Sequence, residues 1–382
     1  MGLISWAKGV ANRLIHKNEV ENALRKETAI SNEMAQAVRL WSDMYANNPP
    51  WKSKTVQTLN IPAVIATKIA KLTTIEAELA ITGSKRAEYL QEQLSPIWDN
   101  IRNITEYAAA KGGILFKPYI LDDNVRIDCV QGDRFFPVSY DSAGNLTGVI
   151  CVAQMTVGKV TYTRLEEHKY SGGSYVITNK AFKSYNQGLL GSPCSLGEVE
   201  EWADIRPETT MTGLENPLFV YFKMPFANNI DDTSPLGVSI YSRAVETIEQ
   251  LDRQYSRLLW EFEGGELAIH ASEDVFKHER GKGGRVAVLP EGKERLYRSL
   301  DWFEDKGGNF FDVFSPAFRD SSLLNGINAL LREIEQQCGL AFGTLSDPQS
   351  VDKTATEVIQ SKQESYSTIV DIQKDIEYAL RR

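Results

Sequence analysis

The N-terminal part of the chain carries apolar side chains at helical spacing. Apolar residues recur at every third or fourth position over 31–46, 61–80 and 86–111, which predicts a helix over each range. Pro96 is expected to kink or split the last of these helices. A shorter amphipathic helix is predicted over 3–15. It could lie on a membrane surface, but docking on its own body or on a neighbouring subunit is favoured.

The period of the pattern changes to two at about residue 112. Ile114, Phe116 and Tyr119 alternate with polar neighbours, as the side chains of half-buried strands do. Turn signals rich in Asp, Asn, Ser and Gly then separate a series of β-rich runs. Residues 112–223 are therefore predicted to form an antiparallel sheet joined to helices, and the fold class is α+β.

Two long helices separated by a small insertion are predicted next. After a polar linker at 225–235, Gly237 opens a helical pattern that stops at Gly264 and Gly265. A β-type segment follows, and Pro316 restarts helical spacing, which ends at Gly339. Such helices would lie side by side and antiparallel, spanning about 33–38 Å at about 1.5 Å per residue. The insertion would project from one end of the pair.

The C-terminal part is predicted to be a loop followed by a last helix. Residues 340–353 contain too many Gly, Pro and small polar residues to stay helical. Asp352 or Thr354 is expected to cap a helix over 354–382. The chain stops inside that helix, so we expect the natural chain to be longer.

Composition and charge narrow the possible functions. The 382 residues are 42% hydrophobic and 24% charged, which is typical of folded protein, and the length suggests two or three domains. Because 51 Asp and Glu outnumber 42 Lys and Arg, the net charge is −9, and tight nonspecific binding to DNA phosphates is not expected. Nucleic acid could still pass without being held. No apolar run approaches the ~20 residues of a membrane span.

Motifs for catalysis are absent from the sequence. It has no phosphate-binding Walker loop, nucleophile elbow, zinc-protease motif or kinase signature. The histidines are too scattered to indicate a triad: His16, His168, His270 and His278. The cysteines are far apart, which favours buried free thiols over a metal site: Cys129, Cys151, Cys194 and Cys338. Neither a cofactor nor a metal is predicted.

Acidic residues leave two questions open. The acidic pairs at 122–123 and 231–232, and Glu263 with Glu266, could hold metal in a hydrolase, but turns and helix ends often carry carboxylates. Acidic residues also outnumber basic ones over 231–274. That excess is typical of a solvated helix face, and a wall that repels a polyanion is the functional alternative.

The order of these parts resembles the portal proteins of tailed bacteriophages, particularly of phages that infect Gram-positive bacteria. Residues 216–223 and the Asn and Asp residues after them are similar to the strand and linker before the first stem helix of such portals. Residues 235–253 are similar to the start of that helix. The resemblance implies a wing of helices and antiparallel strands over 1–230, followed by a first stem helix over 231–263. A small α/β clip over 264–315 and a second stem helix over 316–339 come next. A tunnel loop over 340–353 and a long helix over 354–382, leading toward an absent crown, end the chain.

The resemblance also implies a function. Portal subunits form a non-enzymatic ring, usually of twelve copies, at one capsid vertex, and double-stranded DNA enters and leaves through the ring. The expected partners are the packaging terminase, the head-completion adaptor, and the major capsid and scaffold proteins, with no membrane. The ring would be assembled in the host cytoplasm and end in the virion. A different head-tail adaptor or tail ring protein is one alternative, and a metal-dependent hydrolase is a less favoured one.

Two groups of site residues follow from the resemblance. The tunnel loop is implied to face DNA with mostly small or polar side chains of little net charge: Phe342, Thr344, Ser346, Asp347, Gln349, Ser350, Asp352 and Lys353. Few cations are thus available to phosphates, which suits weak contact with a sliding duplex. The clip is implied to face the adaptor and terminase through Glu266, His270, Glu273, Lys277, Lys282 and Arg285.

Overall fold

The computed structural model describes residues 14–121, 124–186, 188–265, 268–272, 277–281, 284–288, 297–300, 311–314, 319–348 and 355–382. The helix predicted over 3–15 lies outside these residues up to residue 13, and the acidic pair at 122–123 lies outside them entirely.

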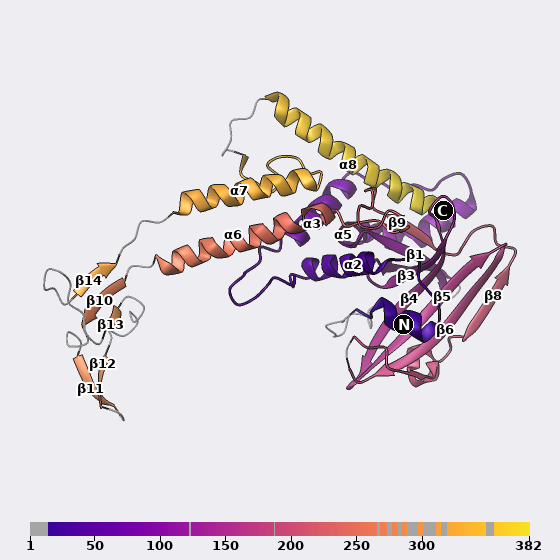
Figure 1. Ribbon diagram of the computed structural model, residues 1–382. Coiled ribbons are helices and arrows are strands. Elements are labelled where there is room, and N and C mark those ends of the chain that lie inside the picture. The colour runs from indigo at the N-terminus through magenta and orange to yellow at the C-terminus, as the bar shows by residue number, and fades with distance from the viewer. Residues whose placement is uncertain are drawn as a thin grey trace.

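Helices occupy the N-terminal part, as predicted (Figure 1). They are α1 (Lys17–Leu24), α2 (Asn32–Tyr45), α3 (Ile61–Thr74), α4 (Lys85–Asp99) and α5 (Ile101–Lys111). The helix predicted to reach residue 80 ends at Thr74, and the next side chain, Ile75, is 59% exposed. The helix predicted over 86–111 is split at Asn100, whose φ of −102° and ψ of 4° leave the helical region. Pro96 lies inside α4, so the break falls after the proline.

Antiparallel strands follow, and they form two sheets where the sequence predicted one. One sheet has the order β2 (Asn124–Gln131), β1 (Gly113–Leu121), β9 (Val220–Lys223). The other has the order β3 (Phe135–Tyr140), β4 (Leu146–Val157), β5 (Val160–Ser171), β6 (Ser174–Ser184), β7 (Ser192–Cys194), with β8 (Glu208–Thr212) also paired to β6. Strand β9 is the last strand before the long helix that begins at Val245, and it pairs with β1. The smaller sheet therefore joins the antiparallel strands to the part of the chain that leads into that helix.

The two long helices are α6 (Val245–Gly264) and α7 (Asp320–Gln337), and they lie side by side and antiparallel (Figure 1). Short 3-10 turns lie at Leu196–Glu198, Glu200–Trp202 and Ser242–Ala244. The first long helix begins later than Gly237, where the sequence predicted it. A Cβ on Gly237 would collide with the carbonyl oxygen of Gly112, and one on Gly112 would collide with that of Gly237. This close approach of two backbones keeps Gly237 in a buried connecting segment. The helix therefore starts only after the 3-10 turn at Ser242–Ala244.

Short strands connect α6 to α7 and project beyond the far ends of both helices (Figure 1). Strand β10 (Ala268–Ser272) pairs in parallel with β13 (Tyr297–Leu300) and antiparallel with β14 (Phe311–Phe314). Strands β11 (Lys277–Gly281) and β12 (Gly284–Val288) form a hairpin. The β-type insertion predicted from the sequence is therefore confirmed for the strands that the structure describes.

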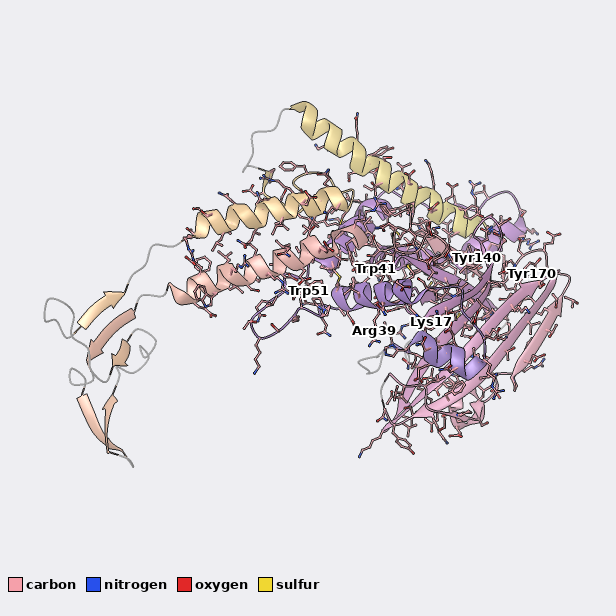
Figure 2. All side chains as sticks on the ribbon, viewed as in Figure 1. Lys17, Arg39, Trp41, Trp51, Tyr140 and Tyr170 are labelled. Atoms are coloured by element: carbon pink, nitrogen blue, oxygen red, sulfur yellow. The ribbon has the colours of Figure 1, made fainter. Side chains whose placement is uncertain are left out.

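The helix pair is joined to the core through a buried tyrosine. Tyr241 lies just before α6, and its hydroxyl donates a hydrogen bond of 2.8 Å to the carbonyl of Trp41 in α2 (Figure 2 labels Trp41). Both side chains are at most 1% exposed. Burying two large aromatic rings contributes several kcal/mol, on the order of 2–3 each. The base of α6 is thus fixed to the helical part of the chain.

The last helix, α8 (Ala355–Arg381), crosses back over the helical part. It contacts α3 and β9, and Gln373 Nε2 donates a hydrogen bond of 2.8 Å to the carbonyl of Thr73. Ile372, Ile376 and Ala379 form its buried stripe. The helix predicted over 354–382 is confirmed.

Candidate functional site

The helix pair is held together at both ends by polar contacts. Near the base, Thr247 Oγ1 donates to Gln337 Oε1 at 3.0 Å. At the far end, the Arg319 guanidinium forms an ion pair of 2.7 Å with Glu261, and its backbone N–H also reaches that carboxylate. Because contacts near both ends fix the same pairing, the helices keep one register along their length.

Asp252 shows that the acidic run on α6 is not one continuous solvated face. Its side chain is 2% exposed and accepts hydrogen bonds from Trp51 Nε1 at 2.9 Å and from the backbone N–H of Leu59 at 3.0 Å. Burial raises the pKa of this carboxyl, and the hydrogen bonds from Trp51 and Leu59 oppose that rise. Asp252 therefore ties the 51–59 segment to α6.

Other acids of the run have partners at the surface. Glu249 forms an ion pair of 2.6 Å with Arg253, one helical turn later, and Glu261 is paired with Arg319. The Glu249 pair supports the solvated-face interpretation, whereas the Glu261 side chain is only 11% exposed. These contacts leave the proposed repelling wall untested.

The loop after α7 is fastened to that helix by a buried carboxylate. Glu335 is 1% exposed and accepts hydrogen bonds from the backbone N–H groups of Gly343, Leu345 and Ser346. It also accepts one of 2.8 Å from the Ser346 hydroxyl. The two carboxylate oxygens of Glu335 thus accept four hydrogen bonds from the loop.

A second contact holds the next residue of the loop. The amide of Asn328, also on α7, bonds Asp347 twice: its oxygen accepts from the Asp347 N–H at 2.7 Å, and its nitrogen donates to the Asp347 carbonyl at 3.3 Å. Residues 343–347 are therefore fastened to α7.

The structure changes what was expected of the predicted loop residues. Ser346 was expected to face DNA, but it is 5% exposed and its hydroxyl is committed to Glu335, so it anchors the loop instead. Phe342 is half-buried under the Arg332 guanidinium, 5.5 Å from the ring centre, and the Thr344 hydroxyl donates to the Ala341 carbonyl. Asp347 is exposed. Four further predicted residues lie outside the described residues: Gln349, Ser350, Asp352 and Lys353.

For the predicted clip residues, the structure gives the strand to which each described residue belongs. His270 belongs to β10, Lys277 to β11 and Arg285 to β12. In the hairpin, Arg285 stands opposite Arg280, and Lys277 stands opposite Val288. Glu266, Glu273 and Lys282 lie outside the described residues.

The described residues offer little to a metal-dependent hydrolase. Within the part of the chain that the structure describes, no group of three or more His, Cys, Asp or Glu side chains could hold a metal ion. Asp231 accepts hydrogen bonds from Thr233 and from the backbone N–H of Ser31, which lowers the pKa of its carboxyl. It thus links a turn to the start of α2.

The cysteines are free thiols, as expected. Burial raises the pKa of Cys129 and of Cys151 to about 12, and raises the pKa of the buried Cys338 as well. A thiol with so high a pKa is not ionised near neutral pH, so these residues are poor nucleophiles.

His168 belongs to a buried charge cluster in the larger sheet. Its Nε2 lies 2.9 Å from Glu166, and its Nδ1 lies 2.7 Å from the Tyr175 hydroxyl. Glu166 also forms ion pairs with Lys117 at 2.8 Å and Arg164 at 3.0 Å. Burial disfavours the charged form, but Lys117, the His168 hydrogen bond and Arg164 outweigh it and lower the pKa of Glu166. We interpret the cluster as structural, because the Glu166 carboxylate is bonded to Lys117, Arg164 and His168 within the sheet.

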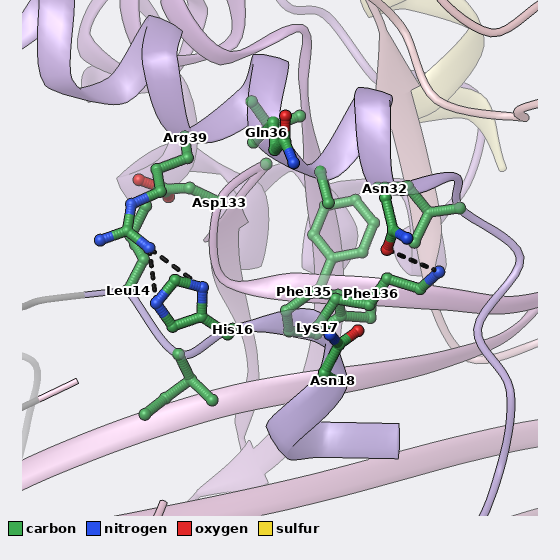
Figure 3. Close-up of a pocket in the computed structure, with 15 residues that line it drawn as sticks. Leu14, His16, Lys17, Asn18, Asn32, Gln36, Arg39, Asp133, Phe135 and Phe136 are labelled. Atoms are coloured by element: carbon green, nitrogen blue, oxygen red, sulfur yellow. Dashed lines mark hydrogen bonds between the residues drawn. The ribbon is translucent and has the colours of Figure 1, made fainter. Parts of the chain in front are cut away.

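A pocket of about 340 Å³ lies between the start of α1, α2 and β3 (Figure 3). Arg39 Nη1 is 2.8 Å from His16 Nε2 there, and Lys17 Nζ is 3.5 Å from Asn32 Oδ1. Asp133, on the wall, is paired with Lys111 at 2.5 Å. Arg39 is paired with His16 and Lys17 with Asn32, and the polar groups do not converge on a common point, so the pocket lacks the arrangement of a catalytic centre.

Comparison with known proteins assigns the chain to a family. Residues 13–382 match the family described as phage portal protein, SPP1 Gp6-like. The chain therefore belongs to this family of phage portal proteins, whose members act at the capsid vertex in DNA packaging. No curated protein matches the chain. Among the described residues, the helices are too short or too polar to span a bilayer.

Sequence reasoning missed the residues that position the loop. The position of Glu335 beside the apolar stripe of α7 was the one sign in the sequence that its side chain is buried. Its partners, however, are mostly backbone N–H groups, which the sequence does not distinguish. Asp252 was counted among solvated acids, although it is buried by the 51–59 segment, about 200 residues earlier in the chain.

Proposed function

We propose that copies of this chain form a closed ring in which α6 and α7 build the stem around a DNA channel. The observation that supports this most directly is the antiparallel pair of long helices, with a β insertion beyond one end and an anchored loop at the other (Figure 1). Residues 1–230 are then the wing, 264–315 the clip, and 340–353 the loop that faces DNA. Twelve copies is the number proposed.

The loop is proposed to touch DNA weakly. Its described part exposes Asp347, and the nearby cation Arg332 lies over the Phe342 ring. Few cations can then neutralise phosphates, so contact should change little with salt concentration. A duplex could slide past such a surface without being trapped.

The insertion is proposed to dock the packaging terminase first and the head-completion adaptor later. Its strands project beyond the helix pair, where a partner can reach them (Figure 1). The basic residues Lys277 and Arg285 belong to its hairpin. Replacing both with Glu should weaken capture of the purified terminase while ring formation persists.

The loop assignment is tested by a short deletion. Removing 349–352 keeps 343–347, which Glu335 and Asn328 hold, so the variant should still fold and form rings. We expect DNA packaging or genome retention to fall in phage that carry this variant. Normal packaging by intact variant rings would show that the loop does not act on DNA.

The protein is proposed to lack catalytic activity of its own. A nuclease assay of the full chain with magnesium or manganese should show no cleavage of double-stranded DNA. Cleavage that disappears in Asp231→Ala would instead support the hydrolase alternative.

A further inference from the structure

An apolar groove runs along one side of the helix pair. It has a volume of about 400 Å³ and is lined by α3, α6, α7 and the loop after α7, with Val64, Tyr255, Leu258, Leu324, Ile327 and Leu331 among its residues. Leu324 is 49% exposed and Val64 38% exposed. Exposed apolar surface of this kind, flanked by polar helix faces, is typical of a protein contact site.

The opposite side of α6 carries one large apolar side chain on a polar stripe. The exposed residues of that stripe are Glu246, Gln250, Arg253, Arg257 and Trp260, and Trp260 is 66% exposed. Because it lies two residues after the groove residue Leu258, it points about 200° away around the helix and stands about 3 Å further along the axis. The tryptophan and the groove are therefore on opposite sides at nearly equal height.

This placement fits the geometry of a ring. In a ring with cyclic symmetry, each copy contacts the next through two different surfaces on opposite sides, and neighbours are not displaced along the axis. Tryptophan is among the residues most often found as energetic anchors in protein interfaces, particularly where it fills an apolar pocket.

We propose that Trp260 of one copy fills the groove of the next copy in the ring, packing against Leu324 and Leu258. The inference rests on the proposed ring and goes beyond it by naming the two surfaces that close it. A second copy is favoured as the occupant because the groove and the tryptophan form a complementary pair on one chain.

Cysteine cross-linking of the full chain tests this contact. The variant with Trp260→Cys and Leu324→Cys should, on oxidation of purified rings, give a ladder of covalent multimers on a non-reducing gel. The variants that carry only one of the two substitutions keep the four natural cysteines and should stay monomeric on that gel. The matched control pairs Trp260→Cys with Ser322→Cys, which lies on the other side of α7, and should give no ladder.

Truncation of the tryptophan gives a second readout. Trp260→Ala should raise the protein concentration needed for half-maximal ring assembly by about tenfold or more, whereas Trp260→Phe and the neighbouring Arg257→Ala should change it much less. Native mass spectrometry measures this directly.

The outcomes separate the two proposals. If the unmodified chain forms no ring, the proposed function fails. If rings form but the 260–324 pair gives no ladder, or gives only a monomer with an internal disulfide, the Trp260 contact is wrong. A ladder from the Ser322 control alone would place the neighbouring copy on the other side of α7 and would also overturn it.

Discussion

The buried carboxylate of Glu335 accepts hydrogen bonds from both the backbone N–H and the hydroxyl of Ser346, eleven residues later. One side chain on α7 therefore sets the conformation of the loop that follows it. We expect a shift of α7 to carry with it the loop residues proposed to lie near DNA.

Glu335→Gln should loosen the loop. The amide nitrogen that replaces one oxygen is a donor, and it would face N–H or O–H donors, at a cost of about 1–3 kcal/mol. Hydrogen exchange followed by mass spectrometry should show faster exchange over 343–346. The exposed Glu333→Gln, two residues away on the same helix, is the control and should leave that exchange unchanged. Equal protection in both variants would mean that Glu335 does not hold the loop.

Gly237→Ala should destabilise the protein because its Cβ has no room against the Gly112 carbonyl. Relief of the clash requires backbone shifts that cost about 1–3 kcal/mol. Gly326→Ala is the matched control: its Cβ would meet Gln254 at an ordinary 3.5 Å, and alanine favours a helix. Urea denaturation should rank the variants with Gly326→Ala at least as stable as the natural chain. A stable Gly237→Ala protein would show that the two backbones are not in close contact.

Asp252→Ala should detach the 51–59 segment from α6. It leaves the Trp51 indole N–H and the Leu59 N–H without their acceptor, which costs about 1–3 kcal/mol for each buried group left unpaired. Tryptophan fluorescence would report the change at Trp51, and chemical denaturation the loss of stability. The neighbouring Arg253→Ala, on the exposed side of α6, should have little effect on either measurement.

The Glu166 cluster should make the free energy of unfolding depend on pH in the acidic range. The pKa of Glu166 is lower in the folded protein than its ordinary 4.5, so the unfolded chain binds its proton more readily. The stabilisation is present above about pH 4.5 and is lost as the pH falls toward the folded-state pKa. Glu166→Gln should lose about 3–5 kcal/mol near neutral pH, because Lys117 and Arg164 stay buried without their anion.

That difference should shrink on acidification. Unfolding free energies of the natural chain and of Glu166→Gln should approach each other below about pH 4. The exposed Glu208→Gln serves as the control and should track the natural chain at every pH. A difference that does not vary with pH would rule out ionised Glu166 as its source.

Local patterns in the sequence predicted α2, the antiparallel strands, the two long helices and α8, because each has one apolar face with a clear period. They did not predict where α6 starts, since that depends on Gly112, far away in the chain. The sequence also led us to expect Ser346 to face DNA, because nothing in a loop sequence indicates that the serine hydroxyl will bond to a buried carboxylate. The residues that position the loop could not be predicted from the sequence, because their partners are distant in the chain or are backbone groups.

Electron microscopy of the assembled full chain, viewed down its axis and from the side, tests the proposed stem most directly. We predict a closed ring with a central opening, a broad wing and a narrow stem in which α6 and α7 surround the opening and the 340–353 loop points into it. A ring whose opening is bordered by the β3–β8 sheet, with the helix pair at the outer edge, would contradict the proposal.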